Sequence, residues 1–577
     1  MDKRTFLFVT STLLIWMVYF AISGPSPQPS ETVDPALRET PVPVADSGGP
    51  SVAGSGSSGT AAAIPPVELP AYEIPAAAAE RAVVVETPLY QAEVSTRGAV
   101  LTAWRLKHYL VHGGDPQGPD NPPVNLIPDR AEANGKLPLR IDFGEAAGWS
   151  TEDVIFFTEA ADVVTVSEDE EQVSLVFTAA MKERGVALTK TLTFQPGSYL
   201  VECRVTVANL ADQPQDLRFD LLLGGDIQRQ GKNGPNPSGA SGPVTLVGEE
   251  REVTKVSKLK APVTLTGRIP WSAVLDTYFG AAILPAQYPA EVIISPPEGK
   301  TSLARIALRM GDRAQAARSP SDFNTALYFG PLDTTVLEAS GHQLIDMIDY
   351  GLWTPIAKVL LDGLKVGYRY TGNWGIAIIL LTVLVKILLT PLTLKQMSSM
   401  GKMQAVQPKI NELRNKYRGN TQKMNEEMMK LYKEQGINPM GGCMPMLFQI
   451  PVFFALYRVL LQAIELRGAP FFFYITDLSA PDPWHVKISV LLMGASMILQ
   501  QKLTPMSGDP RQAKLMMMMP VVFTALFWNF PTGLVIYWLT NNILAIAQQV
   551  ITMKVKGTDK GAKAGTAASR SKDKKTG

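Results

Sequence analysis

Five long apolar runs in the last third of the chain restrict this part to a membrane-spanning helical fold. Runs of this length and composition are typical of helices that cross the hydrocarbon core, because an α-helix satisfies its own backbone hydrogen bonds in lipid. We therefore expect five transmembrane helices within residues 373–553. The runs are Trp374–Leu394, Met444–Ile464, Ile488–Leu503, Leu515–Phe530 and Leu534–Met553.

A sixth apolar segment lies near the N-terminus. Residues 5–22 are an uncharged stretch of 18 residues preceded by Lys3 and Arg4. The stretch is longer than the apolar region of a typical signal peptide, although "AIS" before Gly24 resembles a cleavage site and leaves a cleaved signal peptide as the alternative. The basic flank predicts that residues 1–23 form an uncleaved anchor that begins in the cytoplasm.

The charges of the loops give the orientation of these helices. Residues 395–436 carry nine Lys or Arg against four Glu, residues 502–514 carry three against one Asp, and the tail from Thr552 carries eight against two Asp. Residues 466–485, on the opposite side, carry one Arg and two Asp. Because basic loops stay in the cytoplasm, both termini are expected there and the part after the first span is expected outside.

The composition changes twice between the first and second spans. Residues 24–80 are rich in Pro, Ser, Ala and Gly and hold too little apolar surface to form a core, so they are predicted to be a flexible linker. From residue 81 to 340 many runs alternate between apolar and polar residues, as in "YLVECRVTVANL". This period of two is typical of half-buried strands and predicts a large β-sandwich; Lys190 interrupts it.

The two cysteines and four histidines give no sign of a catalytic or metal site. Cys203 lies in the β-rich part and Cys443 in the membrane part, so they should not pair, and Cys203 is expected to be a buried core thiol. The histidines are scattered, and neither GxxxxGK[ST] nor HExxH occurs. The sequence therefore predicts no ATPase, metalloenzyme or other enzyme, and no cofactor.

Lys386 is a charge inside the run Trp374–Leu394, a little past its midpoint. A centred lysine costs about 2.5 to 3.5 kcal/mol on an insertion scale. Its long stem offers a structural explanation, since the amine can reach toward the cytoplasm. A buried ion pair is less well supported, because the last four spans hold no Asp or Glu before Glu465. We predict a water-filled cavity around Lys386.

Several polar residues are candidates for the lining of this cavity. Thr382 lies one helical turn before Lys386 and shares its face. Tyr537, Asn541 and Gln548 form a stripe at spacings of 4 and 7, and Gln449 and Asn529 supply amides to two further spans. An equally good alternative for each amide is a hydrogen bond that holds two helices together.

Two further segments have helical patterns outside the spans. Residues 395–436 are expected to form a cytoplasmic hairpin of two amphipathic helices joined near Gly419 and Asn420. Its methionines suit either varied partner helices or simple packing of the hairpin. Residues 341–372 mix apolar and charged positions and are expected to lie as an amphipathic helix on the outer membrane surface.

Four motifs resemble the bacterial YidC members of the Oxa/YidC/Alb membrane-protein insertases. They are "NWGIAIILLTVLVKILLTPLTLKQMSSMGKMQAVQPKI", "INPMGGCMPMLFQIPVFFALYRVL", "FFFYITDLSAPDPW" and "FPTGLVIYWLTNNILAIAQQ". The resemblance extends over essentially the whole chain. It implies a polytopic α-helical membrane protein with six transmembrane helices, five of them an insertase core, and a large periplasmic β-supersandwich domain.

The resemblance also implies a site and an activity. The family has a hydrophilic groove, open to cytoplasm and lipid and closed to the outside, with a positive residue at its centre. Lys386 occupies that position where the familiar pattern has Arg, and Thr382, Tyr537 and Trp538 align with positions that meet the nascent segment. The implied function is a membrane protein insertase and chaperone of a Gram-negative inner membrane, acting alone or with the Sec translocon.

Partners and alternatives complete the expectations. Nascent membrane proteins are the implied clients, and the basic tail 554–577 suits either the ribosome or anionic lipid. An alternative function is a transporter or channel that uses the cation for an anionic solute. Another is a carbohydrate-binding module, residues 81–330, on a passive anchor.

Overall fold

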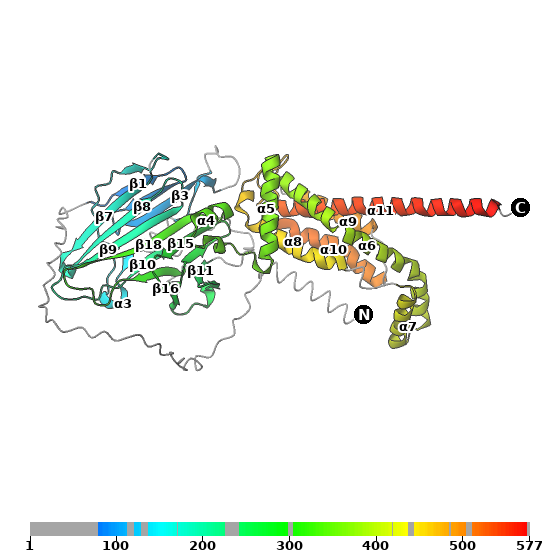
Figure 1. Ribbon diagram of the computed structural model, residues 1–577, viewed down its shortest axis with the longest axis horizontal. Helices are drawn as coiled ribbons and strands as arrows, with labels where there is room; N and C mark the ends of the chain where they lie inside the picture. Colours follow the sequence, from blue (N-terminus) through cyan, green and yellow to red (C-terminus); the bar gives the residue numbers. More distant parts are fainter. Residues whose placement is uncertain are drawn as a thin grey trace, which may run out of the picture.

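The computed structural model describes ten segments of the chain, and the predicted anchor 1–23 and nearly all of the linker 24–80 lie outside them. A sheet-rich region and a helical region follow one another along the long axis of the molecule (Figure 1). The sheet-rich region was predicted. The described segments are 79–111, 121–127, 137–169, 171–224, 242–297, 304–417, 419–436, 444–483, 486–503 and 510–573.

The strands of the sheet-rich region form three sheets. The largest has eight strands in the order β12-β11-β14-β15-β18-β9-β8-β7, and two others have five strands each, β13-β16-β17-β10-β5 and β4-β3-β2-β1-β6. The eight-stranded sheet consists of β12 (Glu250–Val253), β11 (Gly242–Val247), β14 (Trp271–Leu275), β15 (Phe279–Pro285), β18 (Pro320–Pro331), β9 (Leu200–Asn209), β8 (Val186–Phe194) and β7 (Val173–Met181). The five-stranded sheets consist of β13 (Val263–Gly267), β16 (Ala290–Ser295), β17 (Arg305–Met310), β10 (Phe219–Gly224) and β5 (Ile141–Asp142), and of β4 (Pro123–Asn125), β3 (Val100–Leu110), β2 (Tyr90–Ser95), β1 (Ala82–Glu86) and β6 (Val163–Thr165).

The alternating sequence pattern accounts for how these strands pack. In β9, Val201, Cys203 and Val205 are buried in the apolar core, whereas Glu202 and Arg204 between them are exposed. One continuous core contains residues of all three sheets. Burial also raises the pKa of the Cys203 thiol to about 12, so this cysteine is the inert core thiol that was expected.

Lys190, which interrupts the alternation of β8, is fully buried. Its Nζ donates to the carbonyl oxygens of Gly98 at 2.7 Å, Ala99 at 3.1 Å and Leu139 at 2.6 Å. Burial lowers the pKa of Lys190 to about 7, while the three carbonyls supply acceptors for its protons. The lysine thereby connects β8 to two other chain segments and satisfies three buried carbonyl oxygens.

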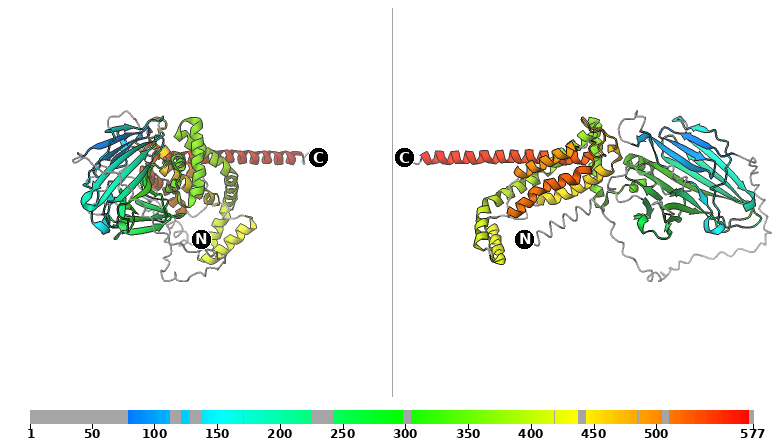
Figure 2. Two further views of the ribbon diagram at one scale, coloured as in Figure 1. Left: turned by 60° about the vertical axis from the view of Figure 1, so that its left-hand side comes forward. Right: turned by 180° about the vertical axis from the view of Figure 1, so that it is seen from behind.

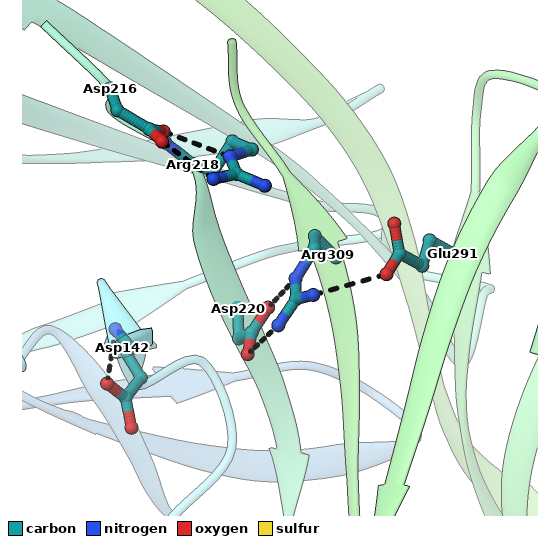
Figure 3. Close-up of polar contacts among 7 residues, drawn as sticks. Asp142, Asp216, Arg218, Asp220, Glu291 and Arg309 are labelled. Atoms are coloured by element: carbon teal, nitrogen blue, oxygen red, sulfur yellow. Dashed lines mark hydrogen bonds and ion pairs between the residues drawn. The ribbon is translucent and has the colours of Figure 1, made fainter. Parts of the chain in front are cut away.

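A row of charged side chains crosses the second sheet (Figure 3). Asp142, Asp220, Arg309 and Glu291 occupy directly opposite positions of β5, β10, β17 and β16. Arg309 donates to both carboxylate oxygens of Asp220, at 2.9 and 3.2 Å, and to Glu291 at 3.2 Å. Such half-exposed pairs contribute little to stability, but they specify the register of the strands.

The helical region contains the five predicted apolar runs largely within helices, but α8 ends at Gln462 and α10 at Leu526, a few residues before the predicted ends of their runs. In α6 and α11 the helix continues far beyond the run, to Lys416 and Asp573, because a change from lipid to water alters the side chains and not the backbone hydrogen bonding. The predicted hairpin 395–436 therefore begins as an extension of α6 and not as a separate helix. The helices are α5 (Thr354–Thr371), α6 (Trp374–Lys416), α7 (Thr421–Glu434), α8 (Met444–Gln462), α9 (Ile488–Leu503), α10 (Pro510–Leu526) and α11 (Thr532–Asp573).

Within the described residues, two helical segments are long and apolar enough to cross a membrane. They are Trp374–Leu394, with a mean hydropathy of 2.4, and Thr532–Thr552, with 1.4. The apolar helices Gln449–Gln462, Ile488–Leu503 and Met517–Asn529 are shorter. The six-span count therefore stays a prediction.

Helix α5 lies across the end of the helix bundle that faces the sheets (Figures 1 and 2). Two polar links join the regions here: Lys365 of α5 donates to the hydroxyl of Thr334 at 2.5 Å, and Arg467 donates to the carbonyl oxygens of Leu110 and Val111 at 2.5 and 3.1 Å. The hairpin of α6 and α7 lies at the opposite end, so the bundle separates it from the sheets.

Candidate functional site

Lys386 lies on α6 where this helix contacts α11. The side chain is half-buried, and its Nζ donates to Oδ1 of Asn541 at 3.2 Å. Among the described residues no carboxylate lies within ion-pair distance of Lys386. The ammonium therefore has a neutral partner from a helix 155 residues away in sequence, and its charge is not cancelled locally.

Thr382 lies one turn before Lys386 on the same face of α6. It is buried, and its hydroxyl donates to the carbonyl oxygen of Ile378 at 2.6 Å. One turn after Lys386, Thr390 donates in the same way to the Lys386 carbonyl at 2.8 Å. Both hydroxyls thus donate to carbonyl oxygens of their own helix. They therefore need no hydrogen-bond partner from a neighbouring helix.

Gln449 of α8 and Tyr537 of α11 form a second polar contact. The amide Nε2 lies 3.4 Å from the tyrosine hydroxyl, and the tyrosine is buried. Both residues were candidates for the lining of the predicted cavity, and the fold brings them into contact. Asn541 lies four residues after Tyr537 on α11, so this contact and the Lys386 contact lie about one turn apart.

Trp538 and Asn529 have different surroundings. Trp538 packs into the apolar core of the bundle, with its ring 5.0 Å from Phe453 and 5.1 Å from Phe527. Asn529 is exposed in a short 3-10 helix, Phe527–Asn529, that precedes α11. Asn541 lies about 14 Å further along the α11 axis from its first residue, so Asn529 belongs to the outer end of the bundle.

Other polar contacts on α11 extend away from Lys386 in the direction of the hairpin. Gln548 donates to the Thr393 hydroxyl of α6 at 2.6 Å, seven residues beyond the Asn541–Lys386 contact on both helices. Asn542 donates to the Ser496 hydroxyl of α9 at 3.0 Å, and Gln549 bonds the carbonyl oxygen of Leu503. Sequence reasoning singled out Gln548 but missed Asn542 and Gln549, whose own spacing of seven is the signal that was available.

A second buried cation was also missed. Arg458 of α8 is only 7% exposed, and the carboxylate of Asp349 is among its favourable electrostatic neighbours. Arg458 lies nine residues after Gln449, near the outer end of α8, and so is distant from the Lys386–Asn541 contact. The sequence analysis considered acidic residues in the spans as partners of a charge and did not single out Arg458.

A cavity with a volume of about 1080 Å³ lies on the sheet-rich region. It is lined by exposed-face residues of the eight-stranded sheet and by residues of α4 (Thr334–Ser340). The water-filled groove around Lys386 stays a prediction. What the described geometry provides at Lys386 is a cation, an amide partner and a line of further amides and hydroxyls along α6 and α11.

Two family models and several relatives match the chain. The model for the 60Kd inner membrane protein matches residues 366–560, and that for the YidC periplasmic domain matches residues 82–362. The membrane protein insertase YidC of Syntrophus aciditrophicus is 38% identical over 560 residues, covering 95% of this chain and 99% of the relative. That of Syntrophobacter fumaroxidans is 38% identical over 480 residues, covering 81% and 85%. A crystal structure of an active YidC insertase matches with a TM-score of 0.34 and 18% identity over 82% of this chain and 92% of the other, so the family assignment rests on the sequence matches.

Proposed function

This chain belongs to the YidC family of membrane protein insertases, and we propose that the contact between Lys386 and Asn541 receives the polar end of a client segment. The observation that carries the proposal is that Lys386 has an amide and no carboxylate beside it among the described side chains. An ammonium group whose partner is a neutral amide keeps its full charge, so an acidic group that replaces the amide gains a stronger, charge-assisted hydrogen bond. Nascent membrane proteins are the clients that this activity implies.

The proposed site is a hydrophilic groove that includes the other sequence candidates. Thr382, Gln449, Tyr537 and Asn541 would line it around Lys386, and Trp538 would form its apolar wall against lipid. Asn529 would act at the outer rim. A wet groove shortens the hydrocarbon path for the polar tail, and the apolar part of the client then enters lipid, which releases about 25 cal/mol per Å² of apolar surface.

The proposed topology has six spans, five of them in residues 373–553, with both termini in the cytoplasm of a Gram-negative cell. Support comes from the basic loops and from the two described helices that meet the length criterion. The family belongs to the inner membrane and has a periplasmic domain, which corresponds here to the sheet-rich residues and is proposed to be a β-supersandwich over 81–340.

Helix α5, within the predicted segment 341–372, would lie on the outer membrane surface. Its residues Ala357, Leu360, Leu361 and Leu364 are buried against the bundle, while other apolar side chains remain exposed on the far side of the helix. An exposed apolar stripe opposite the packed one is typical of a helix at a bilayer interface. The exposed residues of the helix are Val359, Val366 and Tyr370, and Leu352 in the 3-10 helix before it is exposed as well.

Further partners belong to the same proposal. The Sec translocon would share clients with this chain, and the basic tail 554–577 would bind the ribosome or anionic lipid. Support is limited to the family membership and to the positive charge of the tail. The comparisons give no support to an anion transporter, and because relatives match both regions of the chain, they favour neither a passive anchor nor a sugar-binding module.

Reconstitution tests the proposed site directly. Liposomes that contain the full chain should integrate a small single-span client far better than empty liposomes. Lys386→Arg should preserve this activity, whereas Lys386→Ala should reduce it for a client with an acidic tail more than for the same client with a neutral tail. Equal insertion of both clients by Lys386→Ala and the unmodified chain would remove Lys386 from the mechanism.

A further inference from the structure

The loop between α8 and α9 contains a tight turn that displays two phenylalanine rings. The backbone N–H of Phe471 donates to the carbonyl oxygen of Ile475 at 2.9 Å and closes the turn. At its tip Phe473 is 100% exposed and Phe472 is 51% exposed. Two adjacent exposed aromatic rings on a closed turn are unusual for a surface that faces water.

The backbone of the tip is also unusual. Phe473 has φ of +60°, in the left-handed region that glycine and asparagine adopt readily and that a bulky side chain enters only at a cost. Local backbone preference therefore disfavours phenylalanine at this position. Among the described residues no packing contact of the ring offsets this cost, so we expect the benefit to come from its surroundings outside the described structure.

The turn is held firmly against the start of α6. The ring of Phe471 packs on Gly375, where an added Cβ would lie 2.0 Å from Phe471 Cδ2, so this glycine is required for the contact. Asn373, which caps α6, donates from Nδ2 to the carbonyl oxygen of Pro470 at 3.4 Å. The position of Phe472 and Phe473 is thereby fixed relative to the first residues of α6.

This position is the outer end of a membrane-spanning segment. The candidate span Trp374–Leu394 begins beside the turn, and its exposed surface is apolar at Leu380, Leu384 and Leu388. A phenylalanine ring transfers favourably from water into hydrocarbon and has no group that needs a hydrogen bond, so it suits the apolar side of the boundary with the headgroups. The two exposed rings continue the apolar surface of α6 to this level.

We propose that the turn of Phe472 and Phe473 inserts into the outer leaflet of the membrane and fixes the depth of α6. The partner is the acyl and glycerol region of the lipid, which matches rings that offer apolar surface and no hydrogen-bonding group. Because the turn is attached to the first turn of α6, its depth also sets the depth of Lys386, 12 residues further along the same helix. The anchor is distinct from the groove residues, so it is tested separately from them.

Spin-label accessibility measures where the tip lies. In the full chain with Cys443→Ser, and with Cys203 left in place because it is buried, Phe473→Cys is labelled with a nitroxide and reconstituted in phosphatidylethanolamine and phosphatidylglycerol liposomes. Matched controls are Val176→Cys on β7, 45% exposed, and Leu388→Cys in the span, 77% exposed. Dissolved oxygen reports lipid, and a water-soluble nickel chelate reports solvent.

We expect the label at position 473 to collide several-fold more with oxygen than with the nickel chelate, as at 388. A label at 473 that behaves like the one at 176 lies in water and overturns the proposal. Shielding from both reagents would mean that a protein surface covers the tip, which also overturns it.

A second variant separates anchoring from folding. Phe473→Asn fits the left-handed backbone, so the thermal midpoint in detergent should be unchanged or higher. In this variant a label at position 472 should lose at least half of its preference for oxygen. If that preference is unchanged, the Phe473 ring does not hold the turn in lipid and the proposed anchor is wrong.

Discussion

Replacing Lys386 by methionine should make the helix bundle more stable and the protein less active. Methionine keeps the length of the side chain but removes the charge and the hydrogen bond to Asn541. A centred lysine costs about 2.5 to 3.5 kcal/mol relative to an average residue. Loss of the hydrogen bond to Asn541 reduces this gain in stability by about 0.6 to 1.5 kcal/mol.

Subtracting the second value from the first predicts that Lys386→Met stabilises the bundle by about 1 to 2 kcal/mol. We expect a value near the lower end, because the Lys386 side chain is only half-buried. Reversible unfolding of the full chain in mixed micelles, followed by helical circular dichroism, measures this change. Lys386→Gln is the matched control, because it removes the charge but retains a group that can bond Asn541.

The same variants are then tested for insertion in liposomes. Lys386→Met and Lys386→Gln should both lose insertion of an acidic-tailed client, and Lys386→Arg should retain it. A Lys386→Met variant that is less stable than the unmodified chain would mean that the lysine stabilises the bundle. One that is fully active would mean that its charge is not used.

Three further predictions concern packing in both regions. Lys190→Met leaves three buried carbonyl oxygens without their donor and should lower the free energy of unfolding of the sheet-rich region by about 3 kcal/mol, measured by denaturant titration. Gly494→Ala places a Cβ 2.2 Å from Oγ1 of Thr524 and should lower the thermal midpoint of the bundle, with partial recovery when Thr524→Ala is added; equal midpoints would mean that α9 and α10 can separate freely. Lys365→Glu or Glu465→Lys alone should lower the thermal midpoint of the bundle, because the pair holds α5 to the turn that follows α8, and the double exchange should restore part of it; unchanged midpoints in both single variants would mean that the pair contributes nothing to this packing.

The sequence pattern supplied candidate residues for the site but not their partners. The spacing of Tyr537, Asn541 and Gln548 defines a stripe on any helix, but whether it faces α6 or α9 depends on the rotation of α11 in the bundle. The structure turns Asn541 and Gln548 toward α6 and the adjacent residues Asn542 and Gln549 toward α9. Local pattern cannot choose between these faces, because both carry amides at the same spacing.

Element ends were the other weak point. The first basic residue, Lys395, was taken as the end of a membrane helix, and α6 passes through it to Lys416. Charge marks the change of solvent, whereas a helix ends only where its hydrogen bonds end. In the sheet-rich region the strand pattern was clear, and Lys190 could not be explained before the three carbonyls around it were known.

The length of α6 gives the protein a mechanical linkage between the hairpin and Lys386. Its 43 residues extend about 65 Å, so a partner that grips α7 pulls on the same rod that carries Lys386. Pro391 and Pro408 lack the N–H that would stiffen this rod, so it flexes first at these two points. Because Pro391 lies five residues after Lys386, on the side of the hairpin, bending at this proline would tilt the hairpin relative to the part of α6 that carries the contact with Asn541.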